Sequence, residues 1–156
     1  MLLAVDLGLR TGFAVYGRDG RLVRYRSQNL GSKARLRKAA ARVLAEIPDL
    51  EWLVLEGGGD LADAWSKAGE RAGVKVRVIG AERWRRPLLL PREQRSGAGA
   101  KSAADGLARA VIEWSGAKRP TGPLRHDAAE AIAAGLWGVL RAGWLAEVPD
   151  EIQRRR

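Results

Sequence analysis

Apolar residues form short runs along the chain, and turn residues separate these runs. Continuous apolar stretches at 1–5 and 52–55 are typical of strands that are buried on both faces of a sheet. Shorter stretches at 13–16 and 22–25 flank an Asp-Gly pair, which favours a hairpin turn. The chain is therefore predicted to open with three strands in meander order and to add a fourth strand later.

Apolar residues at spacings of three and four predict four helices. The first covers about 33–46, the second lies near 62–72, and two more include 104–112 and 132–140. The remaining predicted pieces are extended: 74–79 and 87–90. This order of elements predicts an α/β fold, a mixed five-stranded sheet flanked by helices.

Length and composition narrow the class of protein. The 156 residues, 46% hydrophobic and 29% charged, predict a single globular domain over 1–148 and a basic C-terminal tail over 149–156. No apolar run approaches the roughly 20 residues of a membrane span. The start has neither a basic leader nor a cleavage site, so we expect a cytoplasmic protein without a membrane partner. Zero cysteines and a single histidine exclude disulfides and zinc-thiolate sites, so any metal is expected on oxygen ligands.

Charge points to a polyanionic partner. The chain has 28 Lys and Arg against 18 Asp and Glu, a net charge of +10, which favours nucleic acid over a membrane surface. The basic residues gather in two blocks, 18–42 and 83–101, and either block alone is equally well explained as a solvated face. Two blocks in one small domain favour a phosphate-binding surface. The arginines of the second block expected to hold a nucleic-acid backbone are Arg83, Arg85, Arg86, Arg92 and Arg95.

Four carboxylates stand at the ends of predicted buried elements. Asp6 and Glu56 each follow an apolar strand, and these two strands are neighbours in the predicted sheet. Asp127 and Glu130 are three residues apart at the start of the last helix, so they share a helix face. If that helix start abuts the sheet, four negative charges converge, and divalent cations compensate them. Oxygen ligands suit magnesium or manganese.

Each of these residues also has a purely structural interpretation. Asp6 can form a turn, and Glu56 can end a strand beside a glycine turn. Asp127 and Glu130 fit a capping box, which satisfies free N–H groups at a helix start. His126 can orient an attacking water, contact phosphate or simply precede the cap. The sequence alone leaves these alternatives open.

Four segments together resemble a known family. In chain order they are LLAVDLGLRTGFAVYG, WLVLEGGG, GAGAKSAADGLARAVIEW and RHDAAEAIAAGLWG. They are spread over residues 2–138, most of the length of the chain, and together they resemble the RuvC family of Holliday junction resolvases, within the ribonuclease H-like superfamily. The resemblance implies two magnesium ions, replaceable by manganese, on Asp6, Glu56, Asp127 and Glu130. It also implies that Lys101 lies near the scissile phosphate, although Lys101 also begins a stripe at helical spacing that is equally typical of a solvated face.

The resemblance implies an activity and partners. A crossover junction endonuclease makes paired, symmetric nicks in a four-way DNA junction, and a domain of this size would act as a homodimer through the helix after Glu56. Alternatives are a ribonuclease H-like nuclease for other branched DNA or structured RNA, and a non-catalytic nucleic-acid-binding module. The sequence leaves open whether a branch-migration helicase is a further partner.

Two positions depart from the family pattern. Glu130 stands where the family usually has Asp. Glycines at 57–59 stand where the family has a bulky apolar residue that wedges into the junction. Leu61 or Trp65 is expected to take the place of this wedge.

Overall fold

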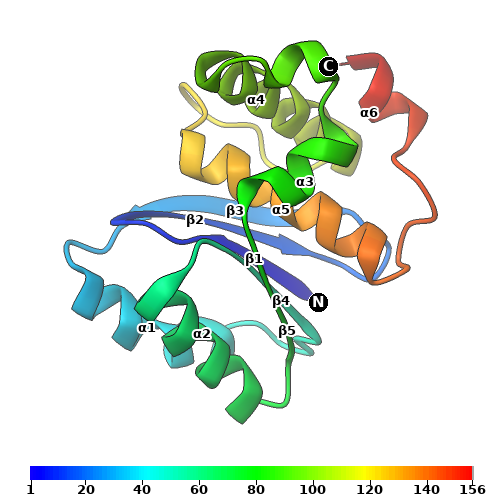
Figure 1. Cartoon of the computed structure of the whole chain (residues 1–156). Coiled ribbons are helices and arrows are strands. Elements are labelled where there is room, and N and C mark those ends of the chain that lie inside the picture. The colour runs from blue at the N-terminus through cyan, green and yellow to red at the C-terminus, as the bar shows by residue number, and fades with distance from the viewer. Residues whose placement is uncertain (156) are drawn as a thin grey trace.

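The computed structural model describes residues 1–155, and the side chains of 1–154. Its centre is a five-stranded mixed sheet in the order β3-β2-β1-β4-β5 (Figure 1). Strands β1 and β2 pair antiparallel, as do β2 and β3, whereas β4 is parallel to both β1 and β5. The strands are β1 (Leu2–Asp6), β2 (Arg10–Tyr16), β3 (Leu22–Asn29), β4 (Trp52–Glu56) and β5 (Lys75–Ile79). The predicted mixed α/β fold and the opening meander are confirmed.

Helices cover both faces of the sheet (Figure 1). One face carries α1 (Lys33–Ala45) and α2 (Gly59–Arg71). The other face carries the remaining helices: α3 (Ala81–Leu88), α4 (Gly97–Ser115), α5 (His126–Arg141) and α6 (Asp150–Arg155), with a 3-10 turn η1 (Pro91–Gln94) before α4. Among the described residues, no helix is long and apolar enough to cross a membrane.

The two faces of the sheet contribute to two separate cores. Leu2 and Ala4 of β1 belong to the core under α4 and α5, whereas Leu3 and Val5 belong to the core with α1 and α2. All four side chains are fully buried. Because successive residues of a strand point to opposite faces, a strand covered on both sides must be apolar at every position. This explains the continuous apolar run at the start of the chain.

Helix α5 packs directly on the sheet through small residues. A Cβ on Gly135 would lie 2.2 Å from the ring of Tyr16, and one on Gly138 would lie 2.9 Å from Val54. The Tyr16 hydroxyl donates a 2.6 Å hydrogen bond to the backbone oxygen of Ile132. The glycines therefore let α5 lie close to the sheet, which fixes where the first turn of α5 reaches the sheet edge.

Two segments differ from the sequence prediction. The stretch 87–90 was expected to be extended, but Pro87 lies in the last turn of α3. This eight-residue helix buries Trp84 and Leu88, one turn apart, and two apolar positions are too few for a clear helical repeat. In the segment expected as a basic tail, α6 buries Ile152 in the core under α4. Arg156 lies outside the described residues.

Candidate active site

The ends of β1 and β4 bring the first two carboxylates together. Asp6 pairs with Glu56 in the parallel register, and the Leu7 amide donates a 2.9 Å bond to the Glu56 backbone oxygen. Leu2 and Ala4 point to the core under α5, so Asp6, two residues after Ala4, points to the same face. The prediction that these two acids stand at neighbouring strand ends is confirmed.

The first turn of α5 completes the cluster because it touches β2 at a glycine. Gly12 is the β2 partner of Asp6, and a Cβ on Gly12 would lie 1.8 Å from the backbone oxygen of Asp127. No side chain fits between helix and strand at this point. The close approach carries Glu130, one turn later, over the end of β1.

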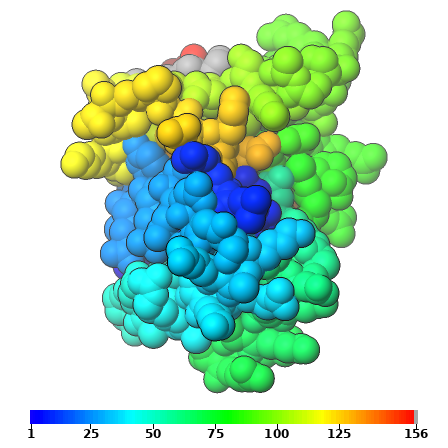
Figure 2. Space-filling model, turned by 90° about the vertical axis from the view of Figure 1, so that its left-hand side faces the viewer, coloured from blue at the N-terminus to red at the C-terminus, as the bar shows by residue number. Residues whose placement is uncertain are grey.

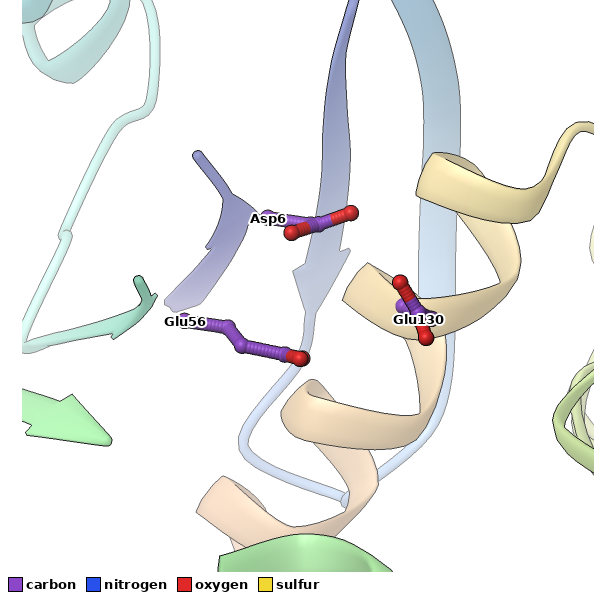
Figure 3. A group of neighbouring side chains, drawn as sticks. All are labelled: Asp6, Glu56 and Glu130. Atoms are coloured by element: carbon purple, nitrogen blue, oxygen red, sulfur yellow. The ribbon is translucent and has the colours of Figure 1, made fainter. Parts of the chain in front are cut away.

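Three carboxylates converge at this edge. One ligand oxygen from each of Asp6, Glu56 and Glu130 lies within 4.8 Å of the other two, and Figure 3 shows Asp6 and Glu56 extending from β1 and β4 toward α5, which carries Glu130. Figure 2 views the molecule from this end, where the dark blue residues after β1 reach the surface below the orange start of α5. An oxygen cluster of this kind can hold a divalent cation.

Asp127 lies beside this group rather than within it. The residue is 8% exposed, and its Oδ2 has no hydrogen-bond partner among the described residues. A buried carboxylate oxygen without a donor is costly, so a cation or an ordered water is its natural partner. Of the four carboxylates expected to converge, the structure joins three and places the fourth next to them.

The capping-box alternative for the last pair is wrong. Arg125 is the N-cap of α5, and Asp127 is already the second residue inside the helix. His126, the first helical residue, is exposed. The α5 acids are therefore free of a capping function, although Asp127 still benefits from the positive end of the helix dipole.

Two residues of α3 hold the outer carboxylates. The Trp84 indole nitrogen donates a 2.7 Å hydrogen bond to Oε2 of Glu56. The Arg85 guanidinium donates a 2.7 Å hydrogen bond to Oε1 of Glu130. Nothing in the sequence assigned Trp84 to the site, and Arg85 was expected on a nucleic-acid backbone. The predicted order of strands does point to α3. Because β5 is parallel to β4, both strands end at the same edge of the sheet, and the segment after β5 begins near Glu56.

Burial and mutual repulsion perturb the cluster. Burial, followed by the charges of Glu56, Glu130 and Asp127, raises the pKa of Asp6 to about 8. Burial and the charge of Glu130 raise the pKa of Glu56 to about 7, against the opposing effect of the Trp84 hydrogen bond. Full ionisation at neutral pH is therefore unfavourable unless a cation is bound. The acids fit a divalent metal by residue type, proximity and unsatisfied charge.

These raised pKa values predict how metal-free stability depends on pH. Between about pH 4 and pH 8, Asp6 is ionised in the unfolded chain but still protonated in the folded chain. The folded state then binds more protons, so this carboxyl lowers stability as pH rises through that window. In chelator, the melting temperature of Asp6→Asn should rise relative to wild type from pH 5 to pH 8.5. A difference that does not change with pH would contradict the assignment.

The predicted basic residues occupy different surroundings. Arg83 and Arg86 are exposed and line a groove that also contains Trp137 and Arg141, near the C-terminal end of α5. Arg92 and Arg95 are exposed in and just after η1. Their expected contact with a nucleic-acid backbone stays a prediction.

Lys101 is exposed, whereas Arg85 forms an ion pair with a carboxylate of the site. Lys101 is exposed near the start of α4, and its expected role near a phosphate stays a prediction. Lys101 begins the stripe at helical spacing noted above. Two later residues of this stripe, Asp105 and Arg109, form an ion pair with a nitrogen–oxygen distance of 2.7 Å. Arg85 is 27% exposed and is paired with Glu130, so the structure places it in the carboxylate cluster.

Three arginines of the first basic block contact other residues of the protein. Arg18 pairs with Glu51 at 2.6 Å, and the Arg21 guanidinium lies over the ring of Trp114. Arg26 lies over the ring of Phe13. These contacts give part of the charge of the first block a role within the protein, and contact of this block with phosphate stays a prediction.

The fold of this chain is similar to that of solved structures. No protein-family model and no curated protein matches the sequence. The structure of Thermus thermophilus RuvC superposes with a TM-score of 0.61 at 18% identity, covering 91% of this chain and 96% of that chain. This chain has the RuvC fold. A second structure, T. thermophilus RuvC in complex with a Holliday junction substrate, gives a TM-score of 0.61 at 19% identity and covers 91% of this chain and 94% of that chain.

The RuvC fold confirms the architecture expected from the four sequence segments. It is a ribonuclease H-like mixed sheet with helices on both faces, and the match extends over nearly all of both chains. At this level of identity, the likeness concerns the fold. The chemistry must be argued from the carboxylate cluster at the end of β1.

The expectation that Trp65 replaces the missing wedge is wrong. Its side chain is fully buried against α1, and its indole nitrogen donates a 3.1 Å bond to the backbone oxygen of Leu36. Leu61, on the same helix, is partly buried against the same core. The glycines at 57–59 thus leave the loop after β4 without a bulky apolar side chain.

Proposed function

We propose that this protein is a divalent-metal-dependent nuclease that resolves four-way DNA junctions by paired nicks. The observation that carries the proposal is the convergence of Asp6, Glu56 and Glu130 at the edge of a RuvC-fold sheet, with Asp127 adjacent. That one of the RuvC structures of this fold holds a Holliday junction supports the choice of substrate. Clustered carboxylates with unsatisfied negative charge would repel DNA in the absence of cations, so a simple binding module would not favour them.

The side chains divide the work at the site. Asp6, Glu56, Asp127 and Glu130 would hold magnesium ions, with manganese as a substitute. When bound, such cations promote the ionisation of water at neutral pH and stabilise the charge of the leaving oxygen. Asp6 lies between Glu56 on β4 and Gly12 on β2, where α5 contacts the sheet, so it would be the central carboxylate of the site. Lys101 would neutralise the scissile phosphate, and the exposed His126 would contact phosphate or orient a water.

The proposal includes a nucleic-acid surface and a second subunit. Arg83, Arg86, Arg92 and Arg95 would contact the DNA backbone. A junction with near twofold symmetry needs two cuts, which two active sites of a C2 dimer supply. Helix α2 would form the dimer interface, and its groove with α1 contains charges of both signs, which suits a self-complementary contact: Arg37, Lys38, Asp60, Asp63, Lys67 and Arg71. A cytoplasmic location and a helicase partner remain predictions.

Cleavage of an immobile four-way junction tests the function. With magnesium or manganese we expect matched nicks in opposing strands, and we expect none with calcium or chelator. Linear duplex and an RNA–DNA hybrid, run alongside, should be cut little. Efficient cutting of flapped DNA or structured RNA, with no cutting of the junction, would replace the proposed substrate. Binding without cutting under all metal conditions would identify a non-catalytic module.

A further inference from the structure

Helix α3 contacts the carboxylate cluster through two successive residues. Trp84 donates to Glu56 on β4, and Arg85 donates to Glu130 on α5. Successive residues of a helix point about 100° apart, so together they span the gap between strand and helix. The two contacts join the sheet edge to the first turns of α5 across the site.

The Trp84 contact is an unusual use of a buried indole. Trp84 and Trp65 are both fully buried, and each indole nitrogen has one acceptor. For Trp65 the acceptor is a backbone oxygen, 3.1 Å away. For Trp84 it is a carboxylate oxygen, 2.7 Å away, on a glutamate that is itself 7% exposed. A short hydrogen bond to a carboxylate is stronger and more directional than one between neutral groups.

The bond restricts Glu56 and leaves part of it available. A glutamate side chain has three rotatable bonds, and ordering it when a ligand binds costs free energy. Trp84 occupies Oε2 and leaves Oε1 without that bond, so the carboxylate is already oriented while one oxygen can bind a cation. Since Trp84 and Leu88 are anchored in the core under α5, the indole itself cannot easily turn away.

We infer that Trp84 is a positioning residue that orients Glu56 for cation binding. The inference rests on the proposed function only insofar as the cluster binds a divalent cation. Hydrogen-bonded partners of metal ligands typically change metal affinity by 10-fold to 100-fold when they are removed. Trp84 acts through Glu56 and needs no contact with DNA.

The test is manganese binding to the full chain, measured by electron paramagnetic resonance without DNA. Trp84→Phe removes the N–H group and keeps most of the ring, and we expect it to weaken manganese binding about tenfold or more. Trp65→Phe is the matched control, because it also removes an indole N–H from a fully buried ring. It should lower the melting temperature to a similar extent and leave manganese affinity at the wild-type value. Equal affinity of all three proteins would overturn the inference.

A second measurement uses only the wild-type protein, so it tests the inference even if Trp84→Phe fails to fold. In the wild-type protein, the indole N–H signal of Trp84 in a nitrogen–proton correlation spectrum should shift on magnesium titration, and that of Trp65 should stay in place. If the Trp84 signal does not shift at saturating magnesium, the inference is overturned.

The results separate this inference from the proposed function. If the wild-type protein cuts no junction but Trp84→Phe weakens manganese binding, the positioning role is supported and the proposed resolution of junctions is rejected. If the wild-type protein cuts junctions and Trp84→Phe binds manganese as tightly as wild type does, the proposed function is supported and the positioning role is rejected. A wild-type chain that binds no manganese would overturn both.

Discussion

Asp6→Asn is expected to lower junction cleavage by about a thousandfold or more at saturating magnesium. The carboxylate of Asp6 belongs to the converging cluster, and it interacts with the charges of Glu56, Glu130 and Asp127. An amide at this position cannot balance a divalent cation. Metal assistance contributes several kcal/mol to such reactions, and each 1.4 kcal/mol is a factor of ten in rate. Single-turnover cleavage of a labelled junction measures the effect.

Binding should survive this substitution. Without metal at neutral pH, the raised pKa of about 8 keeps Asp6 mostly protonated, so Asp6→Asn changes little charge and junction affinity in chelator should equal that of wild type. Asp49→Asn, in the exposed turn before β4, is the matched control, because it removes the same charge at the opposite end of that strand from Glu56. Magnesium-dependent cleavage by Asp6→Asn at the wild-type rate would refute the catalytic assignment.

Gly12→Ala is expected to disrupt both stability and the site. The added Cβ would lie 1.8 Å from the backbone oxygen of Asp127 and 2.3 Å from its carbonyl carbon. Since the obstacle is backbone, the start of α5 must move away from β2, which carries Glu130 away from Asp6. Overpacking costs about 1–3 kcal/mol, or more where backbone must shift. In a domain of this size, 3 kcal/mol corresponds to a drop in melting temperature of roughly 6–12 °C.

Thermal unfolding and manganese binding together test this expectation. Gly106→Ala is the matched control, because Gly106 lies inside α4 and a Cβ there meets no atom within 4 Å. Alanine favours the helix over glycine by about 0.5–1 kcal/mol, so this variant should melt slightly higher and bind manganese normally. Unchanged manganese affinity in a folded Gly12→Ala protein would show that the approach of α5 does not set the cluster.

Several features of the site could be predicted because they follow from local pattern. Asp6 and Glu56 end continuous apolar runs, and such runs predict adjacent buried strands. Adjacent parallel strands must end at one edge, so these two acids had to be neighbours once the topology was inferred. Asp127 and Glu130 share a face because helical spacing requires it.

Other features depend on contacts between distant segments. Whether Asp127 capped α5 or lay inside the helix depended on where the helix begins, and helix boundaries are poorly marked in sequence. Helix α3 carries two inward apolar residues among its arginines, so its repeat was too weak to predict. The partners of Trp84 and Arg85 lie 28 and 45 residues away along the chain.

The sequence by itself determined the order of the strands and main helices, the oxygen-only chemistry and the pair of acids, Asp6 and Glu56, that end neighbouring strands at one edge of the sheet. These follow from periodicity and residue type, which act over a few neighbouring positions. Only the tertiary structure decided that Gly12 lets α5 descend onto β2, that Asp127 stands beside the cluster, and that Trp84 and Arg85 hold its outer carboxylates. Such decisions depend on atoms brought within a few ångströms by packing, and no local pattern records that distance.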